Sequence, residues 1–331
     1  MRKAQVTDMK QNNGMWIATV VMIPLIVIIC MFSINKAKEY VGVDFIIAGK
    51  AELRNTIEIP LSQINELDVS YTSKNIKVYS GDSDKIVIKE YLLSSKEDAK
   101  AECVIKDGKA QVTGKKMSTI IIFGGIGEKI EVYLPKEGLK GVSIATKSGN
   151  ITAEDAFALV AAQVDVQAVS GNIKWQDTQA KEINVSTVSG NIHCNNIIAG
   201  EIALSATSGN IDVEKVEGVM EIATSSGGID ALGVKGYGDF SANSGSIKVE
   251  TDEVTGNVNV QTSSGNVKLL LPKDLSFSFE AETGSGNIHT DFDDKLSYNK
   301  KGNHATGVVG DAAEIQVSAK ANSGSVKVLN K

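Results

Sequence analysis

The chain repeats one short motif, Ser-Gly-x-Ile/Val, at a nearly constant interval. Nine serines mark the repeats: Ser148, Ser170, Ser189, Ser208, Ser226, Ser244, Ser264, Ser285 and Ser323. They follow one another at steps of 22, 19, 19, 18, 18, 20, 21 and 38 residues, and the last step equals two of nineteen. Self-similarity at a short fixed period is the signature of a repeat array, in which each unit buries its core only against its neighbours.

The residues around each marker serine have the periodicity of strands. The second residue before the serine is always threonine or alanine, and the third residue after it is always isoleucine or valine. A period of two places one face of a strand inward, and β-branched residues suit that surface. A second set of glycines lies eight residues before the serine, at Gly200, Gly218, Gly236 and Gly256. Each unit is therefore predicted to be a strand, a tight corner, a strand and a second corner.

The glycine and asparagine after the serine are predicted to hold the shape of the corner. Glycine takes positive φ at no steric cost, and stacked asparagines would share amide hydrogen bonds along the axis as a ladder. These corner and ladder residues are Gly149, Asn150, Gly171, Asn172, Gly190, Asn191, Gly209, Asn210, Gly265, Asn266, Gly286 and Asn287. The serine is also predicted to be structural, because a nucleophile needs its own base and nine equivalent serines cannot each have one.

The repeat predicts an all-β fold, a single-stranded β-solenoid with coils of about 19 residues. Regular coils are expected over residues 141–331. Within this range a polar excursion at 291–314, which we interpret as a hairpin, substitutes for one coil and covers the C-terminal end. Residues 53–140 are predicted to form irregular early coils and an N-terminal cap, which hides the open end of the core. Ser73 marks a degenerate unit 75 residues before Ser148, close to four periods.

An uncharged segment near the N-terminus predicts a membrane anchor. Residues 15–34 are predominantly apolar and carry no charge, and a helix of twenty residues is about 30 Å long, enough to cross a bilayer core. A cleaved signal peptide is the alternative, but it usually has a shorter apolar region and a small-residue cleavage site. We therefore expect a tail at 1–14, a single transmembrane helix and a linker at 35–52. Arg2, Lys3 and Lys10 favour an inside N-terminus, with the bulk of the chain extracellular.

Charge and cysteine content exclude several kinds of partner. The net charge is −6 and the only arginines are Arg2 and Arg54. A nucleic-acid partner would require a basic face, and bidentate recognition of phosphate favours arginine, so we expect no nucleic acid to bind. The three cysteines form neither a disulfide framework nor a CxxC pattern.

Candidate metal ligands do not converge in the predicted solenoid. His193 and His289 share one column but lie several coils apart, so they cannot bind one metal ion. Three aspartates at 291, 293 and 294 lack the spacing of known calcium loops. Aromatic residues, which a carbohydrate platform would require, make up only 5% of the chain. We therefore predict no metal site, no cofactor and no catalytic residue.

One stretch resembles a known family. The segment KIEVYLPKEGLKGVSIATKSGNI, from Lys129 to Ile151, is followed by SGNI and SGSI units. It resembles the bacterial family named "putative adhesin", and is similar to the membrane-anchored members associated with cell-envelope stress operons. The resemblance begins near Leu53 and extends to the C-terminus. It implies a β-solenoid at the cell surface and transfers no catalytic residues.

Three functions follow from these observations. The expected one is a non-catalytic, membrane-anchored surface solenoid that binds or spaces an unidentified envelope protein or polysaccharide. The second is a regulatory or scaffold component of an envelope-stress response. The third, a β-helix enzyme acting on polysaccharides, would require paired carboxylates or a clustered base on one face, whereas the columns alternate lysine and aspartate.

Overall fold

The computed structural model describes residues 44–46, 49–82, 84–115, 119–121, 125–154, 157–311 and 314–331. The chain divides into two units. In the first, β1 (Asp44–Ile46) pairs in parallel with β9 (Thr119–Ile121), and β2 (Gly49–Lys50) with β10 (Gly125–Ile126). The second comprises Ala51–Lys116 and Gly127–Lys331. None of the described helices is long and apolar enough to cross a membrane; the predicted span at 15–34 lies outside the described residues.

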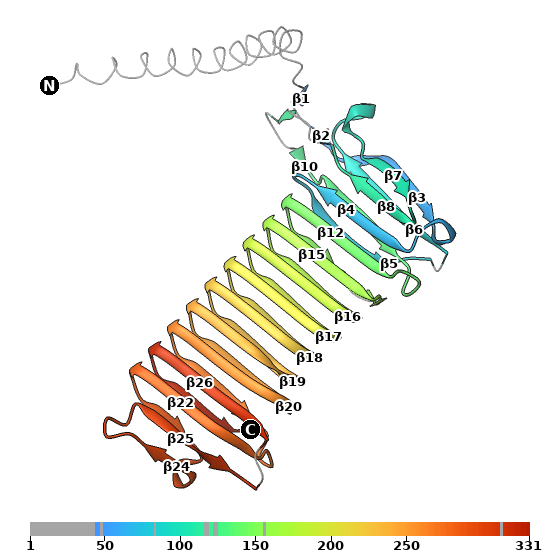
Figure 1. Ribbon diagram of the computed structural model, residues 1–331. Helices are drawn as coiled ribbons and strands as arrows, with labels where there is room; N and C mark the ends of the chain where they lie inside the picture. The colour runs from blue at the N-terminus through green and yellow to red at the C-terminus, as the bar shows by residue number, and fades with distance from the viewer. Residues whose placement is uncertain are drawn as a thin grey trace, which may run out of the picture. The chain divides into compact units, whose positions relative to one another are not determined.

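The second unit is all-β, and its long strands stack in parallel as in a β-solenoid (Figure 1). In the regular part, one continuous strand fills the chain between successive Ser-Gly corners from Ile173 to Ser264, whereas three shorter strands fill the interval between Ser148 and Ser170. The strands of this part are β12 (Gly141–Ser148), β13 (Ile151–Ala153), β14 (Leu159–Val160), β15 (Gln163–Ser170), β16 (Ile173–Ser189), β17 (Ile192–Ser208), β18 (Ile211–Ser226), β19 (Ile229–Ser244) and β20 (Ile247–Ser264). β12 pairs with β15, and both β13 and β14 pair with β16. From β15 to β20 each strand pairs with the next at equivalent positions, as Ile173 with Ile192 and Ser189 with Ser208.

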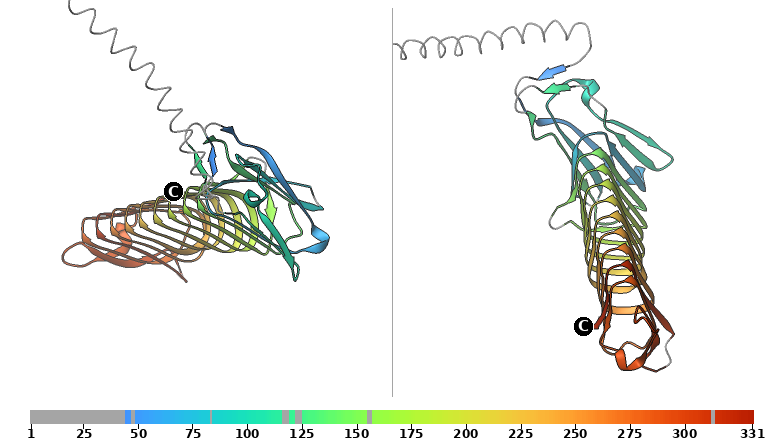
Figure 2. Two further views of the ribbon diagram at one scale, coloured as in Figure 1. Left: turned by 90° about the horizontal axis from the view of Figure 1, so that it is seen from above. Right: turned by 90° about the vertical axis from the view of Figure 1, so that its left-hand side faces the viewer.

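The corners divide each coil into two sheets that enclose the core. We call the residues that lead into the corners the pre-corner sheet and those that leave them the post-corner sheet. Both sheets alternate buried and outward side chains, and the column that begins with Ile151, Ile173 and Ile192 is at most 1% exposed at those positions. Figure 2 shows the stacked strands of this unit from two further sides. The buried aliphatic columns of the two sheets form the core.

Glycine is required at the corner for two reasons. The six corner glycines named above have φ between +148° and +158°, a region that side chains with a Cβ rarely adopt. The coils also approach closely there: a Cβ on Gly209 would lie 1.8 Å from the carbonyl oxygen of Gly190. The marker serines beside them are exposed, at the outer edge of the corner.

The asparagines form a ladder, but the donor is the backbone. Asn172 N–H donates to Asn150 Oδ1 at 2.8 Å, and Asn191 N–H donates to Asn172 Oδ1 at 2.8 Å. This differs from the expected amide-to-amide bonds, because a turning backbone leaves an N–H that needs an acceptor. Gly228 occupies the ladder position after Asn210 and donates to it, but has no side chain to continue the ladder.

The alternation of threonine and alanine before the corner also has a physical cause. Threonine at this position points inward and is buried. Thr187 Oγ1 donates to the Gly171 carbonyl at 3.1 Å, and Thr224 Oγ1 donates to the Gly209 carbonyl at 2.9 Å. Threonine thus satisfies a corner carbonyl of the neighbouring coil, and alanine fits the same space without a polar group.

The second bend in each coil differs from the predicted one. Asp177, Asn196, Lys215 and Gly233 have φ between 51° and 66°, each seven residues after its marker serine, and the first three are skipped by the strand pairing. Of the glycines predicted for a second corner, Gly218 and Gly236 have positive φ but Gly200 and Gly256 do not. Asp and Asn tolerate the left-handed region better than most residues, so among these four coils a glycine occupies the bend only at Gly233.

The N-terminal part of this unit contributes one coil and a cap. β4 (Glu66–Tyr71) and β5 (Asn75–Ser80) form a coil around Ser73 that stacks directly on the Ser148 coil, with Ile76 opposite Ile151. The interval of 75 residues is therefore a single step and not four periods. The intervening chain leaves the array and returns through the cap. The remaining elements here are β3 (Glu52–Pro60), η1 (Leu61–Gln63), β6 (Lys85–Leu92), η2 (Glu97–Ala99), β7 (Glu102–Lys106), β8 (Lys109–Thr113) and β11 (Lys129–Leu134).

The cap closes the N-terminal end of the core with antiparallel pairs. β6 pairs antiparallel with both β3 and β11, and β7 pairs antiparallel with β8. Glu90, which is 1% exposed, accepts hydrogen bonds from Asn55 Nδ2, Tyr71 Oη and Ala101 N–H at 2.6, 3.1 and 2.9 Å. Burial, and then the nearby Glu90, raise the pKa of Tyr71 well above its usual range. This buried carboxylate joins strands of the cap to the first coil.

The C-terminal coils do not stack in the order of the sequence. The end of β20 pairs with β26 (Ile315–Ser323), and β26 pairs on its other edge with β22 (Phe277–Ser285). On the post-corner sheet, β21 (Val267–Leu271) pairs with β27 (Val326–Asn330), which pairs with β23 (Ile288–Thr290). The last coil in the sequence thus lies between two earlier ones (Figure 1).

The polar excursion at 291–314 forms the outer edge of this end. It contains η3 (Asp293–Lys295), β24 (Leu296–Tyr298) and β25 (His304–Val309). β24 and β25 are an antiparallel pair, and β25 also pairs antiparallel with β22. The excursion is a hairpin that covers the last parallel strand; it does not take the place of a coil. The interval of 38 residues before Ser323 arises because the chain passes outward and then returns inward.

A candidate binding groove across the pre-corner sheet

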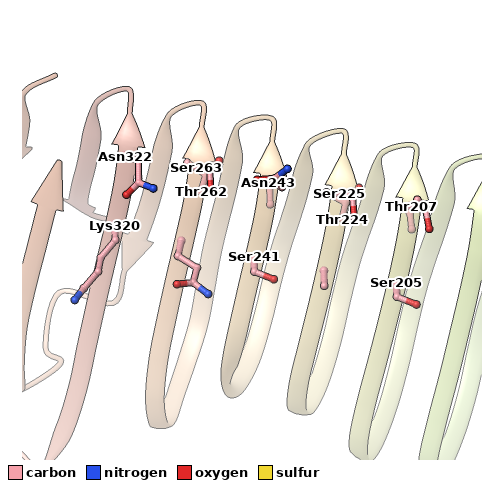
Figure 3. A pocket seen from close by; sticks show the side chains of 14 residues that line it. Ser205, Thr207, Thr224, Ser225, Ser241, Asn243, Thr262, Ser263, Lys320 and Asn322 are labelled. Atoms are coloured by element: carbon pink, nitrogen blue, oxygen red, sulfur yellow. The ribbon is translucent and has the colours of Figure 1, made fainter. Parts of the chain in front are cut away.

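A shallow groove of about 580 Å³ crosses the outer surface of the pre-corner sheet. It runs over β17, β18, β19, β20 and β26, so it lies across successive coils (Figure 3). Its lining consists of the first and third residues before each marker serine, with the inward residue between them. The outward lining side chains are Ser205, Thr207, Ala223, Ser225, Ser241, Asn243, Gln261, Ser263, Lys320 and Asn322.

The groove exists because the outward columns are small at these coils. Serine, alanine, threonine and asparagine leave a hollow where larger side chains would fill the space. The same column continues beyond the groove with the exposed Val169 and Val188, 49% and 52% accessible. The groove therefore presents hydroxyl and amide groups at the strand spacing of about 4.8 Å, with apolar side chains at one end.

The charge at the other end of the groove is already compensated. Lys320 Nζ lies 3.2 Å from Glu280 Oε1 and 3.8 Å from Glu282 Oε2. Burial alone raises the pKa of Glu280, but the hydrogen bonds and charges of Lys320 and His304 bring it below its ordinary value. Aspartate, glutamate and histidine are absent from the described lining. The groove thus offers hydrogen bonds to a neutral, extended molecule and has no acid–base pair.

A second hollow, of about 370 Å³, lies beside the first and is acidic. Glu182 is directly opposite Glu201, and Glu221 is directly opposite Asp239. Asparagines on neighbouring coils donate to some of these carboxylates, as Asn259 Nδ2 does to Asp239 Oδ1 at 2.7 Å. Among the described residues, no three His, Cys, Asp or Glu side chains are arranged to hold a metal ion.

The histidines singled out in the sequence remain far apart. His193 lies opposite Asp212, and His289 lies opposite Lys327. Because the last coil is interleaved, six strand steps separate the two histidines, about 29 Å at 4.8 Å per step. Of the loop aspartates, Asp293 accepts from Thr290 Oγ1 at 3.1 Å and Asp291 accepts from Asn330 N–H at 2.9 Å. Each is used in a local contact.

The two described cysteines are both free. Cys194 is 0% exposed and lies in an aliphatic column opposite Trp175. Burial raises the pKa of its thiol to about 12, so it remains protonated at neutral pH and is a poor nucleophile. Trp175 itself is buried and packs edge-on against Phe157, with ring centroids 5.2 Å apart.

Sequence reasoning missed a cluster of tyrosines on the cap. Tyr79 and Tyr133 stack with ring centroids 5.1 Å apart. Lys89 Nζ lies 4.6 Å from the Tyr133 ring centroid, and Lys129 Nζ lies 4.6 Å from that of Tyr91. Composition hides such clustering, because β5, β6 and β11 bring distant tyrosines together. Ring faces in this cluster are occupied by neighbours, so it differs from an open platform for sugar rings.

Comparison with known proteins identifies the family. The family model "Toastrack DUF4097" matches residues 64–329, which is most of the chain. The chain belongs to the toastrack DUF4097 family. The matched residues begin just before β4 and end in β27, so the toastrack domain includes the coils, the cap strands between them and the interleaved C-terminal end. This confirms the resemblance noted from the SGNI and SGSI units.

Solved structures similar to this toastrack chain include proteins from Bacteroides and Parabacteroides species. A "putative adhesin" from Bacteroides fragilis is 17% identical, with 84% of this chain and 99% of that chain covered and a TM-score of 0.47. A "putative adhesin" from Parabacteroides distasonis is 12% identical, with 86% and 100% covered and a TM-score of 0.43. A "putative lipid binding protein" from the same species is 16% identical, with 86% and 99% covered and a TM-score of 0.48. No curated protein matches the chain.

Proposed function

We propose that this toastrack chain is a non-catalytic surface protein that binds or spaces an extended envelope polysaccharide or protein. The observation that carries the proposal is the neutral groove, whose hydroxyl and amide groups recur from coil to coil. A repeating polar surface suits a polymer that lies across the strands, since each coil of the groove offers a hydroxyl or amide group at the residue before its marker serine. A rigid, capped array of about 19-residue coils also keeps that surface at a fixed geometry.

The proposal includes a single-pass anchor at residues 15–34, with the solenoid outside the cell. It is supported by the uncharged span and by the positive residues that precede it. An anchor of this kind would hold the domain at the envelope, where a polymer is within reach. No cofactor or metal is part of the proposed function.

The topology predicts that the C-terminus is accessible from outside. We expect a tag joined to Lys331 through a specific protease site to be released when intact cells are treated with a membrane-impermeant protease. A tagged cytoplasmic protein in the same cells should stay intact and control for lysis. If the toastrack tag survives in intact cells and is released only after lysis, the solenoid faces the cytoplasm, and a scaffold role in envelope-stress signalling becomes the better explanation.

The groove predicts a localised loss of binding. Ser241 lies in the middle of the groove, so Ser241→Tyr should fill it and weaken binding of detergent-solubilised full-length protein to purified cell envelopes by roughly tenfold, about 1.4 kcal/mol. Asn195→Tyr, on the post-corner sheet, is the matched control and should bind normally. Binding that persists on envelopes stripped of protein would indicate a polysaccharide ligand, and binding that is lost on them would indicate a protein ligand. Equal binding by both variants would contradict the groove as the site.

A further inference from the structure

The interleaved C-terminal coil brings together three lysines that are distant in the sequence. Lys248 lies directly opposite Lys268, and Lys268 lies directly opposite Lys327. His289 continues the same column on the far side of Lys327. We call Lys248, Lys268 and Lys327 the lysine stripe. It lies on the outer surface of the post-corner sheet, away from the groove, and its residues follow one another at the strand spacing of about 4.8 Å.

The charges in the outer part of the stripe are not compensated. At the inner end of the stripe, Lys248 Nζ forms an ion pair with Asp230 Oδ1 at 3.5 Å. Lys268, Lys327 and His289 are exposed, and in the described part of the chain neither Lys268 nor Lys327 forms an ion pair. Like charges directly opposite each other on neighbouring strands are unfavourable. The fold thus keeps an unfavourable arrangement of cations that an anion would relieve.

The columns beside the stripe define the shape of its ligand. On the corner side are Ser246, Asn266 and Ser325, which are neutral. On the other side, the two central coils carry Leu270 and Leu329. The positive charge is therefore one residue wide and runs along the solenoid axis.

Carboxylates occur in that neighbouring column only at the two ends of the stripe. Glu250 is held by Lys331 Nζ at 2.8 Å, and Asp291 accepts from Asn330 N–H at 2.9 Å. They are engaged at the ends and leave the central lysines without a carboxylate beside them.

We infer that the lysine stripe binds a narrow, linear polyanion whose charges lie along the solenoid axis. Lysine binds phosphate and similar anions as a point charge and needs no bidentate geometry. A row one residue wide fits an extended polymer better than a broad membrane surface, which would require basic residues over several columns. This site does not depend on the groove or on the side of the membrane that the solenoid faces.

Labelled inorganic polyphosphate is the probe for this inference, and fluorescence anisotropy of the detergent-solubilised full-length protein is the measurement. We expect binding by the natural protein, with affinity falling roughly tenfold or more between 50 and 200 mM salt as counterions are released from about three contacts. The double variant Lys268→Glu/Lys327→Glu should lose at least about tenfold in affinity, whereas Lys268→Arg/Lys327→Arg should retain it.

The matched control is Lys181→Glu/Lys235→Glu, which changes the net charge equally at exposed lysines outside the stripe. It should bind polyphosphate normally. An equal loss of affinity in both charge-reversal variants would show that net charge alone drives binding and would overturn the stripe as the binding site. If the stripe mediated binding to vesicles of phosphatidylglycerol and phosphatidylcholine but the protein did not bind polyphosphate, the ligand would be a membrane surface, and the inference of a linear polyanion would be overturned.

The stripe also requires that the coils are interleaved, which cysteine cross-linking tests separately. Gln261 lies directly opposite Lys320 on the pre-corner sheet, and Lys320 lies between Gln261 and Glu282. Gln261→Cys/Lys320→Cys should form a disulfide, because opposed residues fall within the Cα distance of about 4.4–6.8 Å that a disulfide spans. Gln261→Cys/Glu282→Cys should not, because the two residues are two strand steps, about 10 Å, apart. The reverse result would place Lys327 away from Lys268 and overturn the inference.

Discussion

Replacing Gly209 by valine is expected to unfold the coils around it, whereas Ser208→Ala should leave stability nearly unchanged. Gly209 has φ of +151°, and a Cβ there would lie 1.8 Å from the carbonyl oxygen of Gly190. The neighbouring coil can avoid that overlap only by breaking the stacking, because the obstructing atom is backbone. We expect a loss above about 4 kcal/mol, in the range reserved for severe core or backbone disruption, against about 0.5 kcal/mol or less for the exposed serine.

Two alanine variants separate the two causes of this loss. Gly302 also has positive φ, of +70°, but has open space around its missing Cβ. Gly302→Ala should therefore cost only the strain of a left-handed residue, about 1–2 kcal/mol, while Gly209→Ala should cost considerably more. Thermal unfolding of the full-length variants, followed by circular dichroism, measures the order. If Ser208→Ala destabilised more than Gly209→Val, the corner would be misplaced.

Deleting one whole coil should leave a folded protein, and deleting half a coil should not. Removal of residues 208–225 joins Thr207 to Ser226, so the coils before and after it meet with their columns in register. In a repeat array each coil contacts only its neighbours, and the lost stability is that of one unit and one interface.

Removal of only residues 208–216 shifts the pattern by an odd number. A shift of one residue in the alternation turns inward side chains outward, and it also sets strands against corners. We expect the shorter deletion to lose its cooperative unfolding transition and its resistance to protease, although it removes fewer residues. Equal behaviour of both deletions would contradict stacking by equivalent columns.

The candidate sites were less predictable than the fold. Sequence reasoning placed the serines in a structural corner, where they are exposed beside glycines of positive φ. It did not find the groove, because a hollow forms only where small outward residues, such as Ser241 and Ser263, lie side by side on neighbouring coils. It did not find the tyrosine cluster either, because Tyr79 and Tyr133 meet only after the chain has left the array and returned.

The sequence by itself determined the repeating coil, its inward columns and its corner. These are local properties: alternation decides which face is buried, and a positive φ at positions such as Gly209 requires glycine.

Only the tertiary structure decided which coil stacks on which. The Ser73 coil lies directly beside the Ser148 coil, and the Ser323 coil lies between those of Ser264 and Ser285. Every coil presents the same columns to its neighbours, so the repeat is compatible with any stacking order. The order that is chosen depends on contacts between distant segments, among them the cap strands at one end and the hairpin at the other.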